Sequence, residues 1–137
     1  MKQKPGSHNC VAVAAALAVG STPEEFEYFI GGPPPYSDYD SYKFLLSKGY
    51  VIGTGVNIKE SPIKDNIITL RFEITTFPAL IIVKSETYKH KMHVIYWDGK
   101  KVHDPNPQVK DGRSLSNYDI HLWFPVNKVD TNGDQYE

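Results

Sequence analysis

The sequence predicts one α+β domain in which helices come first in the chain and strands follow. Residues 1–49 contain three segments with helix start and stop signals. From Tyr50 onward, β-branched and aromatic residues dominate in short runs that are separated by turn-rich breaks. A chain of 137 residues is long enough for one domain with a real core and too short for two comfortable ones. Helices followed by strands are typical of a mainly antiparallel sheet with the helices packed on one side.

The first predicted helix covers residues 10–19. It lies between Asn9, a favoured N-cap, and Gly20, which can adopt the left-handed conformation that ends a helix. Residues 11–19 have no polar side chain, so this helix should be buried on most sides. Cys10, the only cysteine of the chain, stands at its N-terminal end, where free N–H groups and aligned peptide dipoles favour a thiolate over a thiol. A lone cysteine among Ala and Val is more often a small core residue, so a chemical role depends on partners elsewhere.

Two more helices are predicted before the strands begin. Thr22 is a good N-cap for the second, and Ser37 with Asp40 three residues later marks the start of the third. Gly31 and Gly49 supply the stop signals.

Strand-like composition then recurs, and we expect strands at residues 50–56, 67–74, 79–83, 92–97, 100–103 and 120–124. The last segment, 127–137, is polar and is expected to be a loose tail. The predicted domain therefore covers residues 1–126.

Composition excludes several classes of function. The net charge of −1 gives no sign of a nucleic-acid or anionic-membrane surface. A single cysteine excludes an internal disulfide and favours a cytoplasmic location. Lys2 and Lys4 before an apolar run resemble a secretory signal, but the run is rich in Ala with a single Leu, which is a weak signal core and too short to span a bilayer.

The most informative run is 93–105, in which two strands meet at Asp98-Gly99, a strong hairpin signal. A two-residue turn there pairs residue 97 with 100 and, four steps along, His93 with Asp104. Directly opposed Cβ atoms lie about 4.5–5.5 Å apart, within reach of an imidazole–carboxylate hydrogen bond. His103 falls opposite residue 94, on the other face. The sequence thus predicts a His93–Asp104 pair, which a one-residue error in the turn would break.

Together these residues form a possible nucleophilic site. A cysteine at a helix end becomes a nucleophile when a base lies beside it, and a histidine becomes a good base when a carboxylate fixes its tautomer. Cys10, His93 and Asp104 supply the three groups in that order. An oxyanion also needs hydrogen-bond donors, for which the N–H of Cys10 and the side-chain amide of Gln3 are the candidates.

This arrangement resembles the papain-like cysteine peptidase superfamily, in which a Gln lies shortly before a Cys that opens a buried central helix. The closer likeness is to the bacteriocin-leader-processing (double-glycine) peptidase domains of bacterial exporters and their stand-alone relatives. Those domains have a proline-led apolar strand, like 77–83 here, then a His strand, a turn and an Asp-Pro, like His93 and Asp104-Pro105. This chain departs from the pattern in three ways: Gln3 lies seven residues before Cys10, one more than usual, a Val follows the cysteine in place of Gly, and the His-to-Asp interval is short.

The resemblance implies a papain-like α+β fold and a peptidase that cleaves a peptide or isopeptide bond of a peptide or protein substrate. It implies that Cys10 is the nucleophile, His93 the base, Asp104 the residue that orients His93, and Gln3 a part of the oxyanion hole. No metal and no organic cofactor is implied.

Three alternatives remain. An acyltransferase would use the same Cys–His–Asp set, with an amine or thiol in place of water. The protein could also be a peptide-binding module on the same scaffold, without catalysis. Such a module would not need a thiol, an imidazole and a carboxylate together, so the presence of Cys10, His93 and Asp104 argues against it. A metal site built from His90, His93, His103 and Asp104 is disfavoured, because strand parity puts His93 and His103 on opposite faces.

Overall fold

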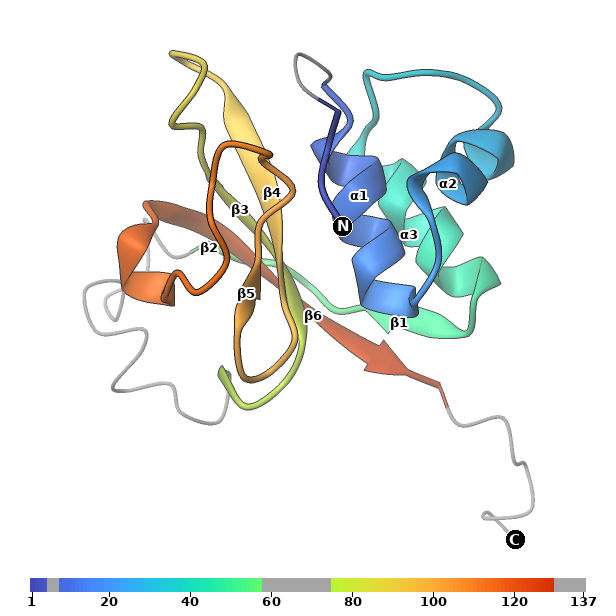
Figure 1. Cartoon of the computed structure of the whole chain (residues 1–137). Coiled ribbons are helices and arrows are strands. Elements are labelled where there is room, and N and C mark those ends of the chain that lie inside the picture. Colours follow the sequence, from blue (N-terminus) through green and yellow to red (C-terminus); the bar gives the residue numbers. More distant parts are fainter. Residues whose placement is uncertain (5–7, 58–74, 130–137) are drawn as a thin grey trace, which may run out of the picture.

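The computed structural model describes residues 1–4, 8–57 and 75–129 of the chain. Within these ranges three helices come first: α1 (Cys10–Val19), α2 (Pro23–Ile30) and α3 (Asp38–Ser47). The strands that follow are β1 (Tyr50–Ile52), β2 (Val56–Asn57), β3 (Ala79–Lys84), β4 (Met92–Trp97), β5 (Val102–His103) and β6 (Ile120–Lys128). The predicted α+β class, with helices before strands, is confirmed (Figure 1).

Local signals explain where the helices begin and end. Thr22 accepts a hydrogen bond on Oγ1 from the N–H of Glu25, the third residue of α2 (3.1 Å). At the start of α3, Ser37 and Asp40 exchange side-chain to backbone hydrogen bonds of 3.2 and 2.9 Å. Gly20 ends α1 in the left-handed conformation, with φ of 70°. Asn9 precedes α1 as expected, but its side chain makes no capping hydrogen bond to that helix.

Every strand pairing in the described ranges is antiparallel. The strand order is β1-β6-β3-β4-β5, and β2 pairs with β6 beside β1. Strand β3 lies between β4 and β6 at the centre of the sheet, which fits its continuous apolar sequence.

Some strand boundaries differ from those expected. The predicted strand 50–56 is two short strands, β1 and β2, with Gly55 between them. At Gly55 the chain passes so close to Phe124 that an added Cβ would lie 2.5 Å from its ring. Strand β6 is longer than the predicted strand 120–124 and passes the predicted domain boundary at residue 126, because Asn127 and Lys128 pair with β1. The polar segment 127–137 therefore begins inside the sheet, and the predicted strand 67–74 lies outside the described residues.

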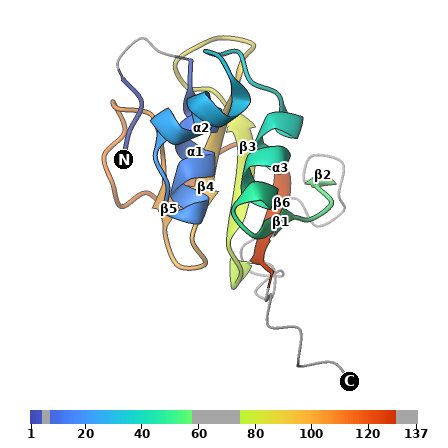
Figure 2. The same cartoon turned by 90° about the vertical axis from the view of Figure 1, so that its right-hand side faces the viewer.

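Alternate residues of the strands face two different apolar clusters. On the helix side, Leu80 and Tyr96 pack with buried alanines of α1 and with Phe26 and Phe44 of α2 and α3. On the other side, a second cluster surrounds Trp123 and includes residues of the segment between β5 and β6. Figures 1 and 2 show the three helices on one side of the sheet. The small side chains of α1 allow that helix to lie close to β4, with its N-terminal end near the start of that strand.

None of the helices found in residues 1–4, 8–57 and 75–129 has both the length and the apolar character needed to cross a membrane.

Candidate active site

Cys10 is the first residue of α1 and is partly exposed. It lines a cavity of about 720 Å³ together with Gln3, His93 and Asp104, so the structure brings all four predicted site residues to one place. The N–H groups of the first helical turn have no partner within the helix and favour negative charge beside them. The volume is typical of a ligand site.

The hairpin that carries the histidine differs from the expected one. The structure pairs Trp97 with Val102 and Tyr96 with His103, so the turn has four residues, 98–101, and not two. The side chain of Asp98 explains the longer turn. Its Oδ1 accepts hydrogen bonds from the N–H groups of residues 100 and 101, at 2.7 and 2.8 Å, which fixes a local turn that competes with the two-residue one.

The predicted register, with residue 97 opposite 100, differs by two residues from the observed one, with 97 opposite 102. Because side chains alternate along a strand, a shift of two residues leaves each side chain on the predicted face of the sheet. Asp104 therefore still lies on the side of His93, although it directly follows β5 and is not its opposed partner in the ladder. His93 Nε2 lies 2.6 Å from Asp104 Oδ1, which confirms the predicted pair. The prediction of a two-residue turn, from which the pair was inferred, is wrong.

His103 belongs to a second histidine–aspartate pair. It lies opposite Tyr96, stacks on that ring at 5.7 Å, and has its Nε2 2.8 Å from Asp98 Oδ2. The four residues of the metal-site alternative are thus not assembled, and in the part of the chain that the structure describes no group of three or more His, Cys, Asp or Glu side chains could hold a metal ion.

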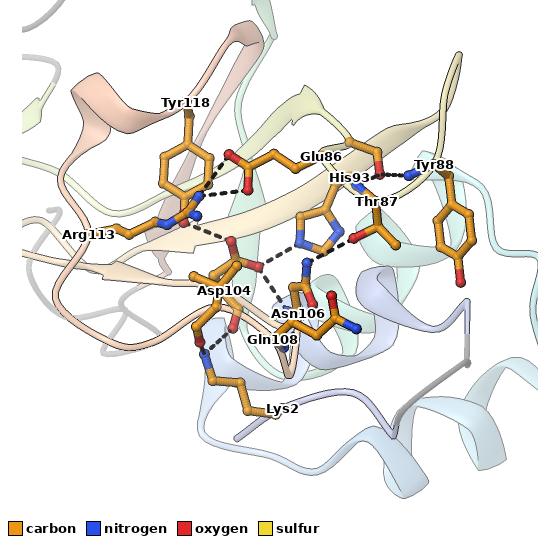
Figure 3. A network of polar contacts seen from close by, with 12 residues as sticks. Lys2, Glu86, Thr87, Tyr88, His93, Asp104, Asn106, Gln108, Arg113 and Tyr118 are labelled. Atoms are coloured by element: carbon orange, nitrogen blue, oxygen red, sulfur yellow. Dashed lines mark hydrogen bonds and ion pairs between the residues drawn. The ribbon is translucent and has the colours of Figure 1, made fainter.

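The carboxylate of Asp104 is buried, with 5% of the residue exposed, and is surrounded by donors (Figure 3). Oδ1 accepts from His93 and from the N–H of Asn106 (2.8 Å), and Oδ2 accepts from the hydroxyl of Tyr118 (2.7 Å). Burial alone would raise the pKa of the Asp104 carboxyl, but the hydrogen bonds from His93 and Asn106, the charge of His93 and the Tyr118 hydroxyl together lower it. Asp104 is therefore ionised at neutral pH.

An ionised carboxylate only accepts hydrogen bonds, so the Nε2 of His93 carries a proton. The other ring nitrogen, Nδ1, is the one left for Cys10. Burial lowers the pKa of His93, but hydrogen bonds to Asp104 and to Cys10, with the negative charges of both, outweigh burial and raise the pKa to about 9. His93 is therefore held as an imidazolium beside the ionised Asp104 at neutral pH.

Gln3 reaches the site because the N-terminal segment lies along the segment that follows β5. The N–H of Gln3 donates to the carbonyl of Pro105 (2.7 Å). Lys2 Nζ donates to the carbonyls of Asp104 and Val109, at 2.7 and 3.0 Å. These bonds join residues more than a hundred positions apart in sequence.

Sequence reasoning missed two residues that contact Asp104. Tyr118 carries no signal, because it lies 14 positions away in a polar segment. The sequence around Lys2 shows its charge and gives no sign of its partner. The bond from Asn106 could have been expected, since an Asp side chain often accepts the N–H two residues on.

Comparison with protein-family models, with curated proteins and with solved structures finds no match to this chain.

Proposed function

We propose that this protein is a papain-like cysteine hydrolase that cleaves a peptide or isopeptide bond. The observation that carries the proposal is the 2.6 Å bond between His93 Nε2 and Asp104, which leaves Nδ1 for Cys10 at the start of α1. Hydrolysis by a cysteine nucleophile requires a thiol with a lowered pKa, an imidazole beside it and a carboxylate that orients the imidazole.

In the first half-reaction the Cys10 thiolate attacks the carbonyl carbon, and a C–S bond forms. The carbonyl oxygen becomes an oxyanion, for which the N–H of Cys10 and the amide of Gln3 are the proposed donors. The C–N bond then breaks, and His93 gives its Nδ1 proton to the leaving amine.

In the second half-reaction His93 takes a proton from water as that water attacks the thioester. The C–S bond breaks, the acid product leaves, and the proton on His93 restores the ion pair with Cys10. Asp104 remains ionised throughout and stabilises the imidazolium.

The fold supports the papain-like interpretation without being specific to it. A buried helix that begins at the cysteine packs on an antiparallel sheet whose strand β4 carries the histidine. The cavity supports a peptide-sized substrate, because its walls include apolar and aromatic side chains such as Val11, Tyr36 and Tyr88. The single cysteine is the basis for proposing a reducing, cytoplasmic location.

An acyl-transfer assay tests the proposal without knowledge of the substrate. We expect p-nitrophenyl acetate to release nitrophenolate in a burst and to leave one acetyl group on Cys10, detected by intact and peptide mass spectrometry. Cys10→Ser should abolish the adduct and His93→Ala should slow its formation by about 10²-fold or more. His103→Ala is the matched control, since it removes the second histidine–aspartate pair.

Two outcomes would overturn the enzyme interpretation: acetylation of Cys10 that is equally fast in His93→Ala, or acetylation of surface lysines alone. Adding glycinamide separates hydrolase from acyltransferase. A hydrolase releases mainly acetate, whereas an acyltransferase passes the acetyl group to the amine.

A further inference from the structure

Tyr118 donates a hydrogen bond to Oδ2 of Asp104. Its hydroxyl donates over 2.7 Å, while Oδ1 is occupied by His93 and by the N–H of Asn106. Tyr118 lies between the short 3-10 helix Leu115–Asn117 and strand β6, 14 residues from Asp104. The contact is therefore made by the tertiary fold and not by local sequence.

The ring of Tyr118 is held on two sides. It packs against the apolar cluster on the face of the sheet opposite the helices. On its other side the guanidinium of Arg113 lies 5.4 Å from the ring centroid, and Nη1 of Arg113 is 2.9 Å from both carboxylate oxygens of Glu86 (Figure 3). The Arg113–Glu86 ion pair thus lies against the solvent side of the Tyr118 ring, and the hydroxyl is directed toward Asp104.

The hydroxyl keeps its proton at any pH at which the site works. Burial raises the pKa of Tyr118, and the hydrogen bond to Asp104 raises it further, against the smaller opposite effect of Arg113. Tyr118 therefore acts as a donor toward Asp104, and Asp104 as the acceptor.

We propose that Tyr118 is a positioning residue of the triad: its hydroxyl fixes the carboxylate of Asp104 so that Oδ1 faces His93, and thereby sets the lowest pH at which Cys10 is reactive. This inference rests on the proposed function. A buried carboxylate that loses one of its donors is left with an unsatisfied oxygen, and it then takes up a proton more readily. A protonated Asp104 no longer stabilises the imidazolium, and the pairing with Cys10 weakens.

The charged and titratable groups around this contact are few. His93 of β4 faces Oδ1, and Cys10 of α1 lies beyond the imidazole. Lys2 binds the backbone carbonyl of Asp104 and the carboxylate of Asp111, at 2.7 and 3.3 Å. Arg113 and Glu86 lie on the outer side of Tyr118. The change expected at acid pH is assigned to the Asp104–His93–Cys10 set, because that set contains the carboxylate to which the Tyr118 hydroxyl donates.

The test compares Tyr118→Phe with the wild type, since phenylalanine keeps the ring and removes the hydroxyl. The rate of Cys10 alkylation by iodoacetamide is measured from pH 4 to 9. We expect the acid limb to move to higher pH, with the rate at pH 5 falling about 3- to 10-fold and the rate at pH 8 changing less than about twofold. Tyr28→Phe on α2, where Tyr28 is 91% exposed, should reproduce the wild-type profile.

A second measurement follows the Asp104 carboxyl itself by ¹³C NMR in the wild type and in Tyr118→Phe. The titration midpoint of Asp104 should rise in the variant, and this expectation holds whether or not the protein is an enzyme. Superimposable titrations of Asp104, or superimposable alkylation profiles of variant and wild type, would overturn the positioning role. Alkylation in the wild type that is no faster than that of a free thiol would instead refute the proposed function, and the NMR comparison would still decide the role of Tyr118.

Discussion

The charge of His93 depends on the folded structure. Its side chain is 15% exposed and touches a carboxylate on one ring nitrogen, so folding raises its pKa from about 6.5 to about 9. An imidazolium at neutral pH can protonate a leaving group but must lose its proton before it acts as a base. The acid–base role proposed for His93 uses both of these forms.

The same shift links stability to pH. A pKa raised by folding contributes stability that is fully present below pH 6.5 and is lost as the pH rises through about 9. We expect the free energy of unfolding, measured with urea, to fall between pH 6.5 and pH 9.5 by an amount on the order of 3 kcal/mol. His93→Gln should be less stable at pH 6.5 and show a much smaller fall over that range. Parallel curves for the two proteins would contradict the raised pKa.

At this scale the sequence allowed prediction of the chemical groups but not of their surroundings. The pairing of His93 with Asp104 follows from strand parity, which survives an error of two residues. Tyr118 and Lys2 escaped prediction because their contacts with Asp104 join distant parts of the chain, and nothing in their own neighbourhood indicates a partner.

Among the elements, the N-terminal segment has an importance that its composition does not indicate. The side chain of Lys2 donates hydrogen bonds to the backbone carbonyls of Asp104 and Val109, which hold the N-terminal segment against the segment after β5. Gln3 is the next residue. If Gln3 contributes to an oxyanion hole, its position depends on that attachment. Alkylation of a thiolate needs no oxyanion hole, whereas acylation does.

Lys2→Met should therefore separate the two reactions. We expect the acetylation rate of Cys10 to fall about 10-fold or more and its alkylation rate to change less than about twofold. Lys110→Met, on an exposed lysine of the same neighbouring segment, should alter neither rate. Equal loss of both rates in Lys2→Met would point to general disruption of the site and against this role.

Helix packing offers a second test at this scale. Phe26 of α2 is completely buried and meets the rings of Tyr36 and Phe44 at centroid distances of 4.9 and 5.0 Å. Phe29 of the same helix is 46% exposed. We expect Phe26→Ala to lower the free energy of unfolding by about 3–5 kcal/mol, because a large cavity remains in the core. Phe29→Ala should cost less than half as much, and similar losses for both variants in urea unfolding would contradict the described packing.

The helices were predicted best among the elements because their signals are local. Caps at Thr22 and Ser37 and stops at Gly20 and Gly31 act within a few residues, and the structure uses them. The prediction of the hairpin turn was wrong because two turn types compete at Asp98. The dipeptide Asp98-Gly99 favours a two-residue turn, whereas the side chain of Asp98 stabilises a four-residue turn. The predicted end of β6 was wrong because Asn127 and Lys128, although polar, pair with β1, which lies 75 or more residues away in the sequence.

For the molecule as a whole, the sheet separates two apolar clusters, and the site lies where the helical layer meets the first residues of β4. Cys10 comes from the helices, His93 from the sheet, and Asp104 from the segment that covers the far face. Each group is thus fixed by a different part of the core. The class of fold was predictable from the order of helical and strand patterns, whereas the papain-like identity stays a prediction.

The pairing of Cys10 with His93 is tested most directly by the pH dependence of Cys10 alkylation by iodoacetamide, followed by mass spectrometry in the wild type, His93→Ala and the matched control His103→Ala. A free cysteine is about 1% thiolate at pH 6.5. We expect wild type and His103→Ala to react at pH 6.5 at least about 10-fold faster than a free thiol, and His93→Ala to lose this advantage. Wild-type and His93→Ala rates that both follow the titration of a free thiol would contradict the paired Cys10–His93 site.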